Sequence, residues 1–325
     1  MQIKRTIDKI PGGLMVIPLL LGATINTFFP NVLMIGGFTT AMFKTGALSI
    51  LGVFLFCMGS QMSPKVAPKS LKKGLILTIT KYAIGVIIGL GVGKIFGPAG
   101  LLGLTPLAII AAMTNSNGGL YVALAGEYGD ETDVGAVSVL SLNDGPFFTM
   151  VALGASGLAT IPIMAFVAVI VPIGLGMILG NADEEMRKFL AGGEKLLIPF
   201  FAFPLGAGMN LANIFKAGGS GILLGVLVAT LTGFGGYYAL KLFGEKNCIA
   251  GLAEGSTAGN SVGTPAAIAA VTTGFAPLVV ATATAQVAAA CIVSAFLCPA
   301  IVVYMSKRLK KKQAIELQQS KVSVS

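Results

Sequence analysis

Apolar residues follow one another along this chain in runs long enough to cross a lipid bilayer, which takes roughly 20 residues in a helix. Short polar connectors separate the runs, and glycine or proline interrupts several of them. The pattern predicts an all-α integral membrane protein with ten transmembrane helices, although the interruptions leave nine or eleven open. The predicted spans cover residues 11–29, 41–62, 74–96, 104–126, 134–155, 160–180, 195–215, 219–243, 248–272 and 275–305.

Two of these runs contain a polar break. The string TNSNGG (114–119) interrupts the fourth span, and a near copy, GNSVGT (259–264), interrupts the ninth. Main chain outside a helix is tolerated at membrane depth only where it is buried in protein or lines a watery cavity. We therefore expect both spans to begin as helices, break at these strings and resume as helices, and the two breaks to meet near the midplane as a binding site.

The breaks belong to a longer internal repeat. Three pairs of segments align in the same order: 114–125 with 259–270 at an offset of 145, 58–74 with 205–221 at 147, and 18–26 with 172–180 at 154. The copies lie five spans apart, and an odd number of crossings reverses direction, so two inverted five-helix repeats with crossed broken helices are predicted. This arrangement is typical of alternating-access transporters, although a duplication without functional consequence is the alternative. The predicted units are 1–158, 159–306 and a basic, polar cytoplasmic tail at 307–325.

Composition and charge support a membrane protein. The chain is 55% hydrophobic and 11% charged, against about 25% charged residues in soluble domains. If the N-terminus is cytoplasmic, most of the 22 Lys and Arg fall on the inner face, as the positive-inside rule requires. Both termini are then cytoplasmic. The net charge of +9 is better explained by topology than by a nucleic-acid partner, and we expect none.

The residue types present exclude several kinds of chemistry. Histidine is absent, which removes Ser-His-Asp and Cys-His catalysis and histidine-ligated metals. The four cysteines lie in or at the ends of apolar segments without paired spacing, so packing is their expected role. We therefore expect no enzyme, no metal site and no cofactor. An intramembrane protease is a weak alternative.

Two acidic residues fall inside predicted spans. Asp144 in SLNDGPFF and Glu254 in LAEGSTAGN are candidates for proton or cation coupling, because intramembrane carboxylates are costly and usually functional. Burial disfavours a charged carboxylate and so favours proton uptake. Helix-end carboxylates that simply reach water are the alternative. Lys81 is expected near the start of its span, which leaves no Lys or Arg in the middle of any span.

Hydroxyl and amide side chains surround these acids. They offer both donors and acceptors to a polyhydroxylated solute, although each one alone could instead bond a neighbouring helix. Ser141 and Gln286 are expected in the same cluster. The predicted substrate-binding residues are Asn115, Ser116, Asn117, Gly118, Asn143, Ser256, Thr257, Asn260, Ser261 and Thr264.

At these residues the sequence resembles a known family. The segments IPGGLMVIPLLLGATINTFFP, AAMTNSNGGLYVALAGEYGD, SLNDGPFFTM and AEGSTAGNSVGTPAAIAA are similar to those of bacterial 2-keto-3-deoxygluconate permeases. The resemblance implies an inner-membrane symporter that brings in this sugar acid together with protons. It also implies a distant similarity to bile acid/sodium symporters, by which Asn115, Ser116 and Glu254 fall where cation ligands would be expected.

The sequence thus predicts a proton-coupled importer of a sugar acid that works by alternating access. Its partners would be the small-molecule substrate, protons and the lipid bilayer, while the oligomeric state stays open. Sodium coupling through the same residues is the first alternative, and a passive facilitator or channel is the second.

Overall fold

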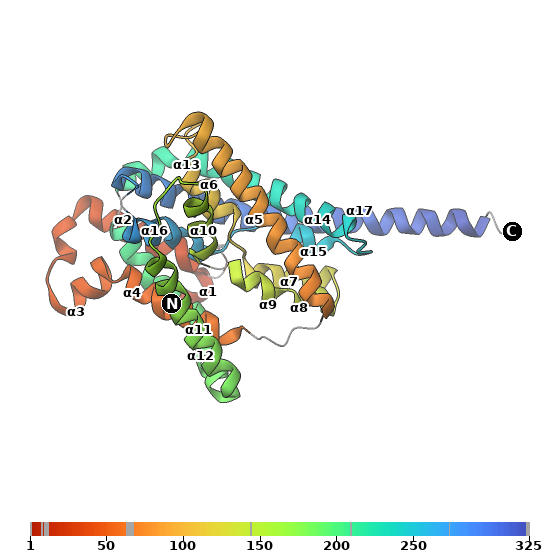
Figure 1. Ribbon diagram of the computed structural model, residues 1–325, viewed down its shortest axis with the longest axis horizontal. Coiled ribbons are helices and arrows are strands. Elements are labelled where there is room, and N and C mark those ends of the chain that lie inside the picture. Colours follow the sequence, from red (N-terminus) through yellow and green to blue (C-terminus); the bar gives the residue numbers. More distant parts are fainter. Residues whose placement is uncertain are drawn as a thin grey trace.

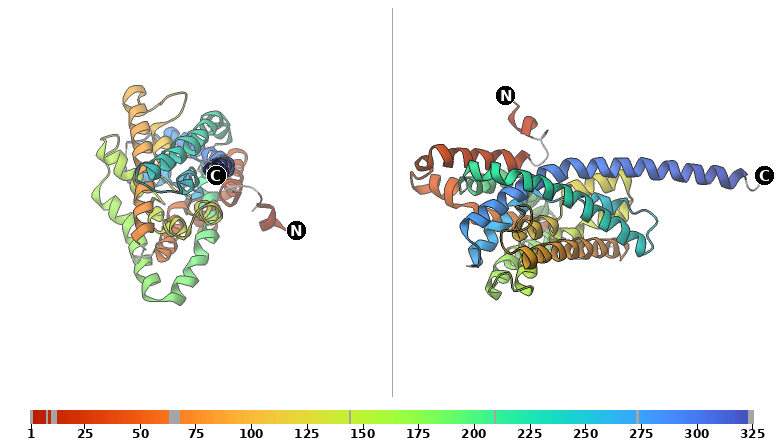
Figure 2. Two further views of the ribbon diagram at one scale, coloured as in Figure 1. Left: turned by 90° about the vertical axis from the view of Figure 1, so that its right-hand side faces the viewer. Right: turned by 90° about the horizontal axis from the view of Figure 1, so that it is seen from above.

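The computed structural model describes residues 2–7, 9, 13–62, 68–143, 145–208, 210–272 and 274–322, which form helices joined by turns and short loops. Figure 1 shows these helices packed side by side in one body. The last helix, α17 (Pro277–Val322), continues beyond that body as a single rod toward the C-terminus (Figure 2). Over the described residues, the expected all-α class is confirmed.

The helices follow the predicted runs in order. In the first half they are α1 (Ile3–Ile7), α2 (Gly13–Phe28), η1 (Pro30–Leu33), α3 (Gly37–Thr40), η2 (Ala41–Thr45), α4 (Ala47–Gln61), α5 (Pro68–Phe96), α6 (Pro106–Met113), α7 (Gly118–Tyr128), α8 (Glu131–Gly135), α9 (Val137–Leu140), η3 (Ser141–Asn143) and α10 (Phe147–Ala155). In the second half they are α11 (Ile163–Ala182), α12 (Glu184–Ala207), α13 (Leu211–Leu227), η4 (Val228–Thr232), α14 (Gly233–Leu242), α15 (Ile249–Ala253), η5 (Gly259–Gly263), α16 (Thr264–Val271) and α17.

Several of these helices are long and apolar enough to cross a membrane. Among the described residues four helices qualify: Pro68–Phe96, Glu184–Ala207, Ala217–Leu242 and Pro277–Leu309. Three bent pairs raise this to as many as seven spans if each pair crosses once. The protein is therefore a multi-pass membrane protein, while the count of ten spans stays a prediction.

The helix break predicted in the fourth span is confirmed. Thr105 caps the start of α6 by accepting a hydrogen bond from the Ala108 N–H, and Pro106 suits the first turn because its missing N–H would have no partner there. The helix ends at Met113, and α7 restarts after Asn117, whose side chain accepts from the Leu120 N–H. The two helices are bent by 43° at this break.

The ninth span breaks earlier than predicted. Helix α15 ends at Ala253, residues 255–258 form no helix, and the GNSVG string forms the tight helix η5 before α16 begins at Thr264. The break therefore starts at Glu254 and not at Asn260. Residues 255–261 are all small, and most of them are glycine or polar. They disfavour a helix throughout the stretch, so the sequence does not fix where the break starts.

Glycines bring α2 against α12 and α4 against α11 at matching points. A Cβ on Gly22 would lie 2.2 Å from the carbonyl oxygen of Phe203, and one on Gly176 would lie 2.0 Å from that of Phe56. Gly22 corresponds to Gly176 at the offset of 154, and Phe56 to Phe203 at the offset of 147. The two contacts are therefore equivalent in the two halves of the chain.

A second pair of glycines repeats this relationship. A Cβ on Gly206 would lie 1.9 Å from the carbonyl oxygen of Leu19, and one on Gly59 would lie 2.2 Å from that of Ile173. The same two offsets relate Gly59 to Gly206 and Leu19 to Ile173. Side chains larger than hydrogen do not fit at any of these four positions without separating the helices.

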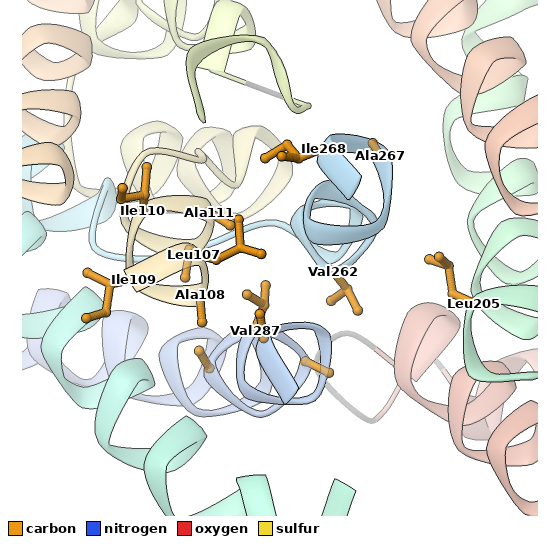
Figure 3. Close-up of a cluster of buried hydrophobic side chains, with 14 of the residues drawn as sticks. Leu107, Ala108, Ile109, Ile110, Ala111, Leu205, Val262, Ala267, Ile268 and Val287 are labelled. Atoms are coloured by element: carbon orange, nitrogen blue, oxygen red, sulfur yellow. The ribbon is translucent and has the colours of Figure 1, made fainter. Parts of the chain in front are cut away.

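The hydrophobic core joins broken segments from both halves. Side chains of α6 pack against η5, α16 and α17, which lie more than 140 residues further along the chain. Figure 3 shows Leu107 of α6 facing the space between Ile268 of α16 and Val287 of α17. This core holds the two predicted breaks close to one another.

Candidate functional site

The site is built around the Glu254 carboxylate, which ends α15 and is 1% exposed. Its Oε1 accepts a short hydrogen bond from the hydroxyl of Ser116, and the amide nitrogen of Asn143 donates to the same hydroxyl oxygen at 3.2 Å. Ser116 and Asn143 are also buried. Three segments, at 114–117, 141–143 and 254–258, thus meet at one carboxylate.

A buried ammonium completes this group. Lys81 Nζ lies 3.2 Å from Glu254 Oε1 and donates to two main-chain carbonyl oxygens, those of Glu254 at 2.7 Å and Ser256 at 2.6 Å. The Lys81 side chain is 1% exposed. A buried charge is stable only when it is paired and hydrogen-bonded, and both conditions hold here.

The expectation that no Lys or Arg lies in the middle of a span was wrong. Helix α5 begins at Pro68 and not near Gly74, so Lys81 falls in the central part of a 29-residue helix. The early turns of α5 contain Lys69, Lys72 and Lys73, which hydropathy alone assigns to the preceding loop. The signal that could have found Lys81 is its position between two apolar stretches, LILTIT and YAIGVIIGL.

Several polar atoms at the breaks are buried but have no hydrogen-bond partner among the described residues. They are both amide atoms of Asn115, Oδ1 of Asn143, Oε2 of Glu254 and Oγ1 of Thr264. Buried polar groups in native proteins are nearly always paired, so such a cluster points to a bound solute, ion or water. Each of these residues is at most 1% exposed, so the site is closed to solvent in this conformation.

The other predicted residues of the second break bond mainly to one another. Thr257 donates from its hydroxyl to the Ser261 hydroxyl at 3.0 Å and from its N–H to Ser294 at 3.3 Å, and Ser261 donates to the Ala258 carbonyl at 2.6 Å. Asn260 is also buried. These bonds fix the conformation of the non-helical chain that follows Glu254.

The remaining predicted residues have different positions. Asn117 caps α7 and Gly118 begins it, both partly exposed, and Ser256 contributes its carbonyl to Lys81. Asp144 lies outside the described residues, so its predicted coupling role stays a prediction.

Gln286 does not join the acids, contrary to expectation. Its side-chain oxygen accepts from the N–H and the hydroxyl of Thr105 at 3.2 and 2.9 Å, while its nitrogen donates to Ser220 at 2.9 Å and to the Gly103 carbonyl. Gln286 therefore links α17 to the start of α6 and to α13, away from the Glu254 carboxylate.

A second charged cluster lies near the start of α5. Lys73 donates to Asp133 at 2.6 Å and to Asp130 at 3.2 Å, and both Lys73 and Asp133 are buried. Asp133 falls in the connector between the predicted spans 104–126 and 134–155 but is 0% exposed, and Tyr121 donates to its main-chain carbonyl at 2.8 Å. The cluster fixes α8 against α5 and α7.

Asp130 caps the start of α8 in this cluster. Its carboxylate accepts from the N–H groups of Thr132 and Asp133, and the Asp133 side chain accepts from the Asp130 N–H, which forms a capping box. Partial burial opposes ionisation of Asp130. Hydrogen bonds from Thr132, Asp133 and Lys73 outweigh that effect and lower the pKa of Asp130 to about 2.

Comparison with known proteins gives one consistent result. A family model described as 2-keto-3-deoxygluconate permease matches residues 4–311. The chain is 54% identical to 2-keto-3-deoxygluconate permease 1 of Salmonella typhimurium, over 97% of this chain and 99% of the relative. It is 44% identical to the permease of Pectobacterium carotovorum (97% and 100% covered) and 39% identical to that of Bacillus subtilis (96% and 96% covered). These matches agree with the resemblance seen in the sequence.

Proposed function

Since the chain belongs to the 2-keto-3-deoxygluconate permease family, we propose that it imports 2-keto-3-deoxygluconate by proton symport through alternating access. Membership in a permease family indicates a transporter and not an enzyme. The observation that carries the proposal is the buried group of Lys81, Glu254 and Ser116, which joins both broken segments. In this proposal the protein lies in the bacterial inner membrane with both termini in the cytoplasm, in agreement with the distribution of Lys and Arg.

The proposed architecture is a pair of inverted repeats. The matching glycine contacts support it, because Gly22 with Phe203 and Gly176 with Phe56 are equivalent at the offsets found in the sequence. Helices α2, α4, α11 and α12 would form one unit, and the helices from α5 to α10 and from α13 to α17 the other. Alternating access would consist of one unit rocking against the other around the breaks.

The charges at the site favour coupling of a proton to an anion. With Glu254 ionised and Lys81 protonated, the pair carries no net charge. A proton taken up by Glu254 would leave the Lys81 ammonium in excess, and the carboxylate of a sugar acid would then neutralise it. The loaded site would be electrically neutral again, which lowers the cost of moving it through the membrane interior. Asp144 is proposed as the second proton carrier.

The substrate hydroxyls would be bound by amides and hydroxyls at the breaks. Asn115 is the best placed of these side chains, because both of its buried amide atoms have no partner among the described residues. Unsatisfied buried groups discriminate strongly between solutes, since a substrate that cannot pair them binds poorly.

Sodium coupling is the first alternative, since carboxylate and carbonyl oxygens can bind Na⁺ and a carboxylate can also take up a proton. A passive facilitator is the other. Uptake of labelled 2-keto-3-deoxygluconate into proteoliposomes distinguishes the three, with a proton gradient imposed in one set and a sodium gradient in another. We expect accumulation with the proton gradient alone.

Empty liposomes and the Glu254→Gln variant serve as controls, and the variant should lose accumulation although it inserts normally. Accumulation driven by the sodium gradient would identify Na⁺ as the coupling ion and leave the proposed substrate unchanged. Equilibration without accumulation would favour the facilitator. No uptake by folded protein under either gradient would remove the proposed substrate.

A further inference from the structure

The surroundings of the Lys81 ammonium are those of a bound cation. Three oxygens face Nζ: the carbonyls of Ser256 and Glu254 at 2.6 and 2.7 Å, and Glu254 Oε1 at 3.2 Å. An ammonium carries three N–H donors, so the number of acceptors matches the number of donors. All three oxygens come from one short stretch, the second break, at a point buried from solvent.

This set of oxygens does not depend on lysine. Residues 255–258 form no helix, and the two carbonyls turn toward Nζ. Main-chain carbonyls and a carboxylate are the ligands that hard monovalent cations prefer, because the oxygens replace the hydration shell. Unwound carbonyls of broken helices have this role in ion-coupled transporters. A lysine elsewhere in the same helix is held differently, since Lys73 is paired with two aspartate side chains.

We infer that the second break is a monovalent-cation site whose occupant is the chain's own ammonium, Lys81. Two consequences follow. The wild-type protein takes no diffusible cation between Glu254 and Ser256. Removal of the ammonium opens the same oxygens to Na⁺ or to another small monovalent cation. The inference deepens the proposed function and rests on it for the role of the break in transport, but its test requires no substrate.

The test compares purified wild-type protein with Lys81→Ala, which frees both the oxygens and the space of the side chain. Lys81→Met is the matched control, because an apolar side chain of similar length fills that space without a charge. Melting temperatures are measured in sodium, ammonium and choline chlorides at matched ionic strength. Choline is a bulky quaternary ammonium without N–H donors, so it cannot bind these oxygens as Na⁺ or ammonium would.

Lys81→Ala should melt several degrees higher in sodium or ammonium than in choline, as expected for a ligand that binds the folded state alone. The wild-type protein and Lys81→Met should not distinguish the three salts. Lys81→Gln, whose amide can still donate to a carbonyl, is the second variant, and a smaller shift is expected for it. Lys73→Ala should show no preference for sodium or ammonium.

Equal melting temperatures of Lys81→Ala in the three salts would overturn the inference. So would failure of both Lys81→Ala and Lys81→Gln to fold in any of these salts, since a free cation should then replace the ammonium. The result is independent of the uptake assay. If sodium raises the melting temperature of Lys81→Ala but the wild-type protein transports no sugar acid, the cation site stands and the proposed substrate is wrong. If the wild-type protein shows proton-driven uptake but the melting temperature of Lys81→Ala does not depend on the salt, the proposed function stands and the cation site is wrong.

Discussion

Lys81 and Glu254 form an ion pair with 3.2 Å between Nζ and Oε1, although 173 positions separate them in the chain. One residue lies in the middle of α5 and the other at the end of α15. The pair therefore links a continuous helix of the first half to the broken segment of the second half.

Loss of either member should destabilise the protein strongly. Removing one partner of a buried ion pair typically costs about 3–5 kcal/mol, because the other charge is left uncompensated. We expect Lys81→Met and Glu254→Gln each to lower the melting temperature and to abolish accumulation of substrate. The double variant should recover much of the stability but none of the transport. Thermal unfolding of the four proteins gives the coupling energy, and purely additive losses would contradict a direct interaction.

Ser116→Ala should weaken transport without preventing folding. The Ser116 hydroxyl donates to Glu254 and accepts from Asn143, and a hydrogen bond to a charged group contributes about 1.5–3 kcal/mol. We expect the rate of uptake at low substrate concentration to fall about tenfold or more. Ser156→Ala is the control, since that hydroxyl donates to Leu153 at the end of α10. Equal losses in the two variants would argue against a specific role for Ser116.

Alanine at the contact glycines should destabilise the two halves alike. A Cβ at Gly59 or Gly206 would fall within 2.2 Å of a carbonyl oxygen on the neighbouring helix, and overpacking of this kind costs about 1–3 kcal/mol or more. Gly52→Ala lies in the same helix as Gly59 but meets nothing within 4 Å. It should be neutral or slightly stabilising, because alanine favours a helix. Yields of folded protein and melting temperatures test both expectations, and opposite effects at Gly59 and Gly206 would weaken the case for the repeat.

Stability should depend on pH through Asp130. The pKa of this carboxyl falls from an ordinary value of 3.8 to about 2 in the folded protein. A depressed pKa gives a stabilisation that is complete above the unfolded value and is lost as the pH falls through the folded one. The melting temperature of the wild type should therefore decline between about pH 4 and pH 2, and that of Asp130→Asn should decline less. The effect is modest because the side chain is 56% exposed. Parallel pH profiles for the two proteins would show that another group is responsible.

The local pattern of the sequence predicted the break in the fourth span well. Asparagine, serine and glycine at 115–118 disfavour a helix wherever they occur, and the helix indeed stops at Met113 and restarts at Gly118. Such propensities act on neighbouring residues, so the sequence alone is enough to find them.

The partners of buried charges could not be found in the same way. Lys81 and Asp133 resemble a lysine near a helix start and an aspartate in a loop, because hydropathy does not record which distant group compensates a charge. The packing of α5 against α14, which in turn packs against α15, brings Lys81 to Glu254, and the packing of α5 against α8 brings Lys73 to Asp133. The packing of α17 against α6 likewise places Gln286 outside the predicted cluster, because its amide bonds to Thr105.

Two of the three oxygens around Lys81 belong to the main chain. No substitution at position 254 or 256 deletes a carbonyl. Mutation can therefore alter the carboxylate and the lysine, but not the two main-chain oxygens that bind the ammonium. The two carbonyl oxygens therefore remain whatever residue occupies position 81. That one residue decides whether the positive charge they bind belongs to the protein or comes from a cation in solution.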